Sequence, residues 1–159
     1  MKLPYENSTS GEKAVQDIQK ILRTFGCAKF GHMMDYEKGE LLVQFECLNY
    51  PVSVKASIHG YAAAWLKHHP YGHRMQCSKI DHERKAMAIG STAVYSILRD
   101  WIKGQITAVE TGILTFEGAF LGQIMLPTGM TVLETAQKQN LLPTLEDKSK
   151  KIKDNPCPA

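Results

Sequence analysis

The sequence has no run of about 20 uninterrupted apolar residues, which is the length that a membrane-spanning helix requires. Its most apolar region is interrupted by Arg99, Asp100 and Lys103. An apolar segment of the kind that directs a chain to secretion is also missing near its N-terminus. Together these absences predict a soluble, cytoplasmic protein with no membrane partner.

Close cysteine pairs are missing as well. The four cysteines are Cys27, Cys47, Cys77 and Cys157, and no two of them form a CxxC motif. Widely spaced cysteines in a cytoplasmic chain are typical of reduced thiols. Cys27 and Cys47 fall on the apolar side of predicted strands, where a thiol behaves as a small, inert hydrophobic group. The sequence therefore predicts reduced thiols.

Motifs that carry catalytic chemistry are equally scarce. The chain has neither a glycine-rich phosphate-binding loop with its lysine nor a serine nucleophile elbow. Asp35 and Glu46 lie on neighbouring predicted strands, as the carboxylates of a nuclease metal site would, but no lysine follows Glu46 at two residues. We therefore predict a protein that is not an enzyme, with no catalytic residues and no cofactor.

What the sequence does contain fits one ordinary domain. A chain of 159 residues with 43% hydrophobic residues is long enough to bury a core without covalent staples. Its net charge of +3 is too mild to indicate nucleic-acid binding by itself. Residues 1–143 are predicted to form a single α+β domain. Residues 144–159 are Lys-rich, contain Pro156 and Pro158 and lack an apolar pattern, so a disordered tail is predicted there.

Hydrophobic periodicity predicts the element order α-β-β-β-α. Apolar residues recur at helical spacing from Ala14 to Phe25, between a capping-box pattern at residues 9–12 and Gly26. The period changes to two over residues 27–36, 41–47 and 52–58, which predicts a three-stranded antiparallel meander. Pro51 favours an edge position for the third strand. The predicted outer face of the meander carries Gln44, Glu46, Ser53, Lys55 and Ser57.

A short helix over residues 60–67 and a polar loop over 68–79 precede a long helical region. Its apolar stripe runs from Ala86 to Phe120, which is too long for one straight helix in a compact domain of this size. Either the helix breaks at Gly104 or Gly112, or it extends and pairs with another chain. We predict a homo-oligomer in which Trp101, Ile102 and Val109 lie near the contact.

The segment around the polar loop mixes basic and aromatic side chains. Cationic groups neutralise phosphates and aromatic faces stack on bases, so this mixture is what the binding of a single strand or a nucleic-acid loop requires. The alternative for the same residues is the solvated rim of a polar loop. The predicted binding residues are Tyr61, Trp65, Lys67, Tyr71, Arg74, Lys79, Arg84 and Lys85.

Histidines are dense in the same segment. His69, His73, Cys77 and His82 are weak candidates for a zinc site, because zinc takes about four nitrogen or sulfur ligands. Their spacing matches no standard zinc finger, so no metal site is predicted.

The second half of the chain resembles a family of small phage and prophage proteins. The resemblance is carried by residues 102–113 (IKGQITAVETGI), by Phe116-Glu117 and Phe120-Leu121, and by residues 126–132 (LPTGMTV). These proteins have a long helix with an AVExGI core and end in an LPxGxTV turn. The resemblance implies an origin in a mobile element, and hence a bacterial or phage-infected host cell, but no catalytic residues. Thr128 stands where the family more often has an acidic residue.

The order of a helix, three strands and a helix is also loosely similar to the double-stranded-RNA-binding domain. The consecutive lysines and the tight glycine turn of that domain are missing here. Strand-then-helix order occurs in single-strand annealing proteins too, which is an analogy of fold alone.

These observations favour a non-enzymatic phage or mobile-element accessory protein that binds nucleic acid or a nucleoprotein complex. The alternative is an anti-defence inhibitor or sponge that captures a host protein or a signalling nucleotide. A third interpretation is a virion or assembly component in which the long helix makes the contacts.

Overall fold

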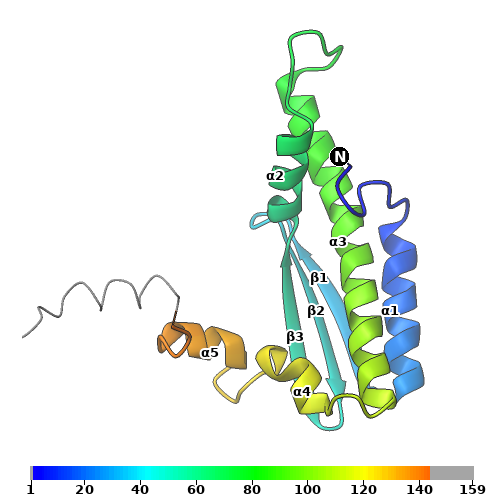
Figure 1. The fold of residues 1–159 in the computed structure, drawn as a ribbon, viewed down its shortest axis with the longest axis vertical. Coiled ribbons are helices and arrows are strands. Elements are labelled where there is room, and N and C mark those ends of the chain that lie inside the picture. The colour runs from blue at the N-terminus through cyan, green and yellow to red at the C-terminus, as the bar shows by residue number, and fades with distance from the viewer. Residues whose placement is uncertain (1, 144–159) are drawn as a thin grey trace, which may run out of the picture.

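The computed structural model describes residues 2–143, and the tail predicted over residues 144–159 lies outside them. The chain has the predicted α+β fold, with a helix, a three-stranded antiparallel sheet and a long helix in that order (Figure 1). The elements are α1 (Gly11–Phe25), β1 (Lys29–Asp35), β2 (Glu40–Cys47), β3 (Tyr50–Ser57), α2 (Ile58–His68), α3 (Lys79–Glu110), α4 (Phe116–Phe120), the 3-10 helix η1 (Leu121–Gln123) and α5 (Val132–Lys138).

Helix α1 begins and ends at local signals. Its N-cap is Ser10 rather than Thr9, because the Ser10 hydroxyl accepts a hydrogen bond from the Lys13 backbone N–H at 3.1 Å. It ends at Gly26, which adopts a left-handed conformation with φ of 100°. Its buried face, Ala14, Ile18 and Leu22, packs toward the sheet and α3.

The strands lie in the order β1-β2-β3, so β1 and β3 are the edges of the sheet. Alternate residues of β2, namely Leu41, Val43, Phe45 and Cys47, are buried in the core that α1 and α3 share. The opposite face of the sheet carries exposed side chains such as Met33 and Gln44. The helices therefore cover one face and leave much of the other open.

The C-terminal part of the described chain covers the β3 edge. Ile124 forms a β-bridge with Val52, and the Met125 N–H donates to the Pro51 carbonyl at 2.8 Å. Helix α5 then follows, capped by Thr131, and Glu134 in its first turn pairs with Lys55 of β3. Ser53 is buried for this reason, so its predicted place on the exposed outer face is wrong.

Helices α2 and α3 form a hairpin that extends beyond the end of the sheet (Figure 1). Helix α2 begins at Ile58, directly after β3, with Ser57 as its N-cap. Helix α3 then runs back along α2 and across the sheet for 32 residues, about 48 Å at 1.5 Å per residue. The fold therefore holds the loop between these helices, residues 69–78, away from the sheet.

Gly90 allows the two helices of the hairpin to approach closely. A Cβ atom at this position would lie 3.1 Å from the Ile58 carbonyl oxygen, whereas one at Gly104 of the same helix would meet nothing within 4 Å. We expect Gly90→Val to lower the free energy of unfolding by about 1–3 kcal/mol, because α2 must shift. Gly104→Val should leave it unchanged or raise it slightly. Urea denaturation of both variants checks this, and equal effects would contradict the close contact.

The long apolar stripe is divided between two helices. Helix α3 passes through Gly104 without a break and ends at Glu110, shortly before Gly112, which has a positive φ of 73°. Helix α4 then folds back, so that Phe116 and Phe120 enter the chain's own core. Of the predicted alternatives, the structure has the break at Gly112.

Because α4 folds back, the chain itself buries part of the surface that was predicted to contact a second copy. Ile102 has an exposed fraction of 0% within one chain, so the prediction that it lies at a contact with a second copy is wrong. The Trp101 ring packs edge-on against Phe120, with centroids 5.7 Å apart, and Val109 is half-buried against the same core. The chain itself covers Ile102 completely and the other two side chains in part. Oligomerisation stays a prediction, as does a contact near Trp101 and Val109.

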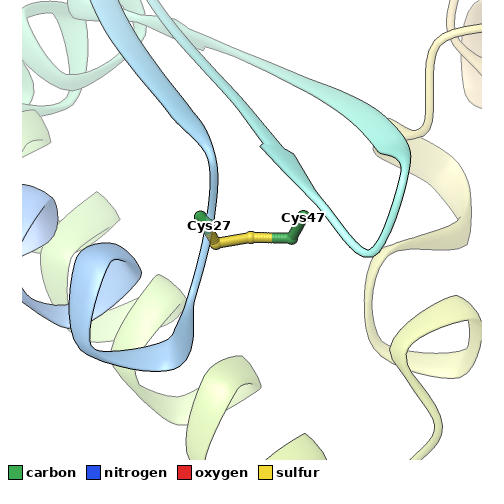
Figure 2. Close-up of a disulfide and its surroundings, with 2 residues drawn as sticks. All are labelled: Cys27 and Cys47. Atoms are coloured by element: carbon green, nitrogen blue, oxygen red, sulfur yellow. A yellow bond between two sulfur atoms is a disulfide. The ribbon is translucent and has the colours of Figure 1, made fainter.

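A disulfide joins Cys27, just before β1, to Cys47, the last residue of β2 (Figure 2). Their Cα atoms are 4.4 Å apart, within the range that a disulfide spans. The prediction of reduced thiols is therefore wrong for these two residues, because the strand pairing brings them side by side. Cys77 is a free, exposed thiol. Disulfides persist mainly in oxidising compartments, so the cytoplasmic prediction loses the support of the cysteines.

No helix within residues 2–143 has the length and apolar character that crossing a membrane requires.

Candidate nucleic-acid interface

The outer end of the α2–α3 hairpin, residues 67–85, is called the hairpin tip here. It contains five Lys or Arg side chains and two acidic ones, a difference equal to the net charge of +3 of the whole chain. Acidic and basic residues therefore balance over the rest of the sequence. The basic residues of the tip are Lys67, Arg74, Lys79, Arg84 and Lys85, and all are exposed.

The base of the tip is a packed aromatic cluster. Trp65 stacks on His69, with centroids 4.4 Å apart and planes inclined by 15°, and it also contacts His82 at 5.2 Å. His82 is buried, and its Nε2 lies 2.7 Å from the His69 carbonyl oxygen, to which it donates. The cluster joins the end of α2 to the first turn of α3. It therefore fixes the direction in which the tip points.

The N-terminal segment supports the same region. The Tyr61 hydroxyl donates to the Pro4 carbonyl at 2.5 Å, and the Tyr5 hydroxyl donates to Asp100 of α3 at 2.8 Å. The Glu6 carboxylate lies 3.8 Å from Nε2 of His69. Residues 2–8, which carry no periodicity in the sequence, are therefore held against α2 and α3.

Hydrogen bonds within the loop give it a defined shape. The Tyr71 hydroxyl donates to the Cys77 carbonyl at 3.0 Å, and the Met75 N–H donates to the Gly72 carbonyl at 3.0 Å. Ser78 is the N-cap of α3, and its hydroxyl accepts from the Asp81 backbone N–H at 3.1 Å. These hydrogen bonds therefore fix the backbone of the loop, and its exposed side chains extend from it into solvent.

Two basic residues of the tip are balanced by local partners. Arg84 pairs with Asp81 at 3.0 Å, and Lys79 lies 4.0 Å from Glu83. The Ser78 hydroxyl donates to the Asp81 carboxylate at 2.6 Å and, with Arg84 contributing, lowers the pKa of Asp81. Asp81 is therefore charged at neutral pH. Lys67, Arg74 and Lys85 have no ion-pair partner among residues 2–143, so they offer the free positive charge.

The structure brings six of the predicted binding residues to the surface of the tip and withdraws two. Trp65 is only 6% exposed, and Tyr61 is half-buried and bonded to Pro4. The predicted role of Trp65 in stacking on bases is wrong, because its ring packs against His69 and His82 inside the hairpin. The role of Tyr61 stays a prediction, with its hydroxyl bonded to the N-terminal segment. Tyr71 is the aromatic residue of the set that stays exposed. The tip therefore offers several exposed cations for phosphates but only one well-exposed ring for a base.

The weak zinc candidates serve other purposes. Within residues 2–143, no group of three or more His, Cys, Asp or Glu side chains is placed to hold a metal ion. His69 and His82 pack on Trp65, whereas His73 and Cys77 lie exposed in the loop. The sequence pattern of Ser78 three residues before Asp81 could have identified the start of α3. The packing role of the histidines had no sequence signal.

Asp35 and Glu46, the carboxylates considered for a nuclease site, lie far apart along the strands. The register pairs Asp35 with Glu40 at one end of the β1–β2 ladder and Lys29 with Glu46 at the other. Lys29 also forms an ion pair with Glu46 at 2.8 Å. These two carboxylates do not share one site.

Comparison of the chain with protein-family models, curated proteins and solved structures gave no match. The resemblance to phage and prophage proteins therefore stays a prediction.

Proposed function

We propose that this protein is a non-enzymatic accessory protein, of mobile-element origin, that binds double-stranded nucleic acid through the hairpin tip. The observation that carries the proposal is the concentration of the chain's excess positive charge on a protruding, internally braced end of the molecule. Positive side chains that replace the counterions of phosphates supply most of the affinity in sequence-independent binding.

The choice of a duplex follows from the aromatic residues. Proteins that bind single strands without sequence preference combine cations with several exposed rings on which bases stack. Here Trp65 is buried and Tyr61 is bonded to Pro4, so Tyr71 alone of the three predicted rings is well exposed. A surface that contacts phosphates and not bases favours the more densely charged duplex and has little base preference.

Capture of a signalling nucleotide, the sponge alternative, finds less support. A nucleotide sponge needs a concave pocket with cations placed for the phosphates. A cavity of about 590 Å³ lies between α1, β1 and α3, but its lining includes Glu12 and no Lys or Arg. A hollow of about 380 Å³ between α1 and α3 is lined by Lys20, Arg99 and Lys103, but Asp17 and Asp100 line it too and both pair with Arg99, which leaves less net positive charge for a phosphate. The basic residues of the tip belong instead to the protruding end of the α2–α3 hairpin.

The proposal is tested by reversing the free charges of the tip. The triple variant Lys67→Glu, Arg74→Glu, Lys85→Glu replaces the side chains without ion-pair partners in the described region, so the fold should persist. We expect duplex affinity to fall by about a hundredfold or more, and the salt slope to decrease by about 0.9 for each phosphate that the variant no longer neutralises. Fluorescence anisotropy with a labelled duplex and single strand of equal length, over a range of salt, measures both.

The matched control reverses the same amount of charge on the outer face of α1, through Lys13→Glu, Lys20→Glu and Arg23→Glu, all at exposed positions. This variant should keep most of the duplex affinity. Equal decreases in the two variants would show that overall charge, and not the tip, governs binding. Absence of binding by the unaltered protein at low salt would end the proposal.

A further inference from the structure

One edge strand of the sheet, β3, is covered by a later segment of the chain, and the other, β1, is not covered by a described segment. The β3 edge is bridged by Ile124 and Met125, but β1 has a hydrogen-bonded strand on one side only among the described residues. Unpaired edge strands offer a row of N–H and C=O groups to another chain, and proteins usually protect them with proline, charge or a bulge. Between Lys29 and Asp35, β1 has five consecutive uncharged residues and no proline.

We propose that β1 is the contact between two copies of this chain, which join edge to edge in antiparallel orientation into one six-stranded sheet. This inference concerns assembly and does not rest on the proposed function. A two-fold axis perpendicular to the sheet would pass midway between His32 of one copy and His32 of the second copy, which would stand opposite each other. The occupant of the edge is a second copy because the sequence of β1 is complementary to itself in this register.

Charge complementarity fixes the register. Pairing about His32 places Lys29 of one copy opposite Asp35 of the other at both ends of the new ladder, with all four side chains on the open face of the sheet. Opposite charges directly across an antiparallel pair are stabilising. Moving the axis to Gly31 or Met33 keeps the faces matched but leaves neither Lys29 nor Asp35 opposite a β1 residue of the other sign. Only the register centred on His32 places Lys29 and Asp35 of β1 opposite each other.

The charged groups are positioned for this pairing. Lys29 bonds to Glu46 in its own chain, which holds the ammonium group on the open face. Oδ1 of Asp35 accepts hydrogen bonds from the Glu37 and Lys38 backbone N–H groups, both at 3.0 Å, so Oδ2 faces no donor of the β1–β2 turn. Each carboxylate can therefore keep its turn contacts and still accept from the second copy's Lys29.

Shape is complementary as well. Met33 is 59% exposed although it lies in the middle of a strand. In the register about His32 it stands opposite Gly31 of the second copy, and a Cβ at Gly31 would meet nothing within 4 Å. A large apolar side chain thus covers a glycine on each side of the axis, which removes both the exposed methionine and the exposed glycine backbone from water.

The first test is the oligomeric state of the full chain at micromolar concentration, by sedimentation equilibrium. We expect a dimer, and we expect Met33→Lys to dissociate it, because the new cation would lie diagonally across from Lys29 of the second copy. Leu121→Lys is the matched control, since Leu121 is 56% exposed and lies away from the β1 edge. A monomeric wild type, a dimer that survives Met33→Lys, or equal dissociation by Leu121→Lys would each overturn the proposal.

The second test reads the register directly. In a chain with Cys77→Ser and Cys157→Ser, the added substitution His32→Cys should give a disulfide-linked dimer under mild oxidation, because opposed residues of an antiparallel pair have Cα atoms about 4.5–5.5 Å apart. Lys38→Cys, in the exposed β1–β2 turn, should not cross-link, because the register separates its two copies widely. Cross-linking through Lys38→Cys but not His32→Cys would contradict the proposed register.

Discussion

Replacing Ile102 by Asp is expected to unfold this protein rather than to separate subunits. Ile102 of α3 has no exposed surface and belongs to the core that α3 shares with the sheet, α1 and α4. Removing a buried isoleucine side chain costs about 2–5 kcal/mol even when alanine replaces it. An unpaired carboxylate at the same place adds a desolvation cost of several kcal/mol. The total is comparable with the whole stability of an ordinary domain.

Ile113→Asp provides the matched comparison for this prediction. It is the same substitution at a position that is 74% exposed, beyond the end of α3. We expect it to change the free energy of unfolding by about 0.5 kcal/mol at most. Circular dichroism and urea denaturation distinguish the two variants. An Ile102→Asp protein that stays folded and only changes its sedimentation would restore the long helix as an interface.

Reduction of the Cys27–Cys47 disulfide is expected to lower the free energy of unfolding by about 3 kcal/mol. The bridge closes a loop with a sequence separation of 20 residues, and opening it returns conformational freedom to the unfolded chain. Urea denaturation with and without a reducing agent measures the difference, and mass spectrometry shows whether the oxidised chain is lighter by two hydrogen atoms. This comparison needs no substitution, so no change in packing enters it.

The double variant Cys27→Ala, Cys47→Ala is the control for the reducing agent. Its stability should not depend on the reductant, which isolates the effect of this bridge from any effect on Cys77. Equal stability of the oxidised and reduced wild type would show that the bridge contributes little. If the prediction holds, a chain in a reducing cytoplasm is less stable than the same chain in an oxidising compartment.

The tip and the β1 edge are independent parts of the molecule. The tip extends beyond one end of the sheet, whereas the edge runs along its side (Figure 1). Substitutions at Lys67, Arg74 and Lys85 therefore leave β1 unchanged, and Met33→Lys leaves the tip unchanged. In an antiparallel dimer joined at β1, the two tips would extend from opposite ends of the joined sheet.

Local sequence determined the elements of this fold. The helical spacing of α1 with Gly26 at its end, and the change to a period of two over the strands, depend on which side chains follow one another within a few residues. The same is true of the β1–β2 turn, because Gly39 has the positive φ that such a turn requires. These features could be predicted because neighbouring residues are sufficient to specify them.

Tertiary structure alone decided what each element contacts. The stripe after Ala86 looked too long to be covered by one chain, but a turn at Gly112 brings Phe116 and Phe120 back into the core that contains Ile102. Trp65 lies in a segment whose basic and aromatic composition is typical of a binding site, yet its ring packs against His69 and His82. Cys27 and Cys47 are joined because the pairing of β1 with β2 brings their Cα atoms together. Each outcome depends on residues distant in sequence, and a periodic pattern carries no information about which distant surface will cover it.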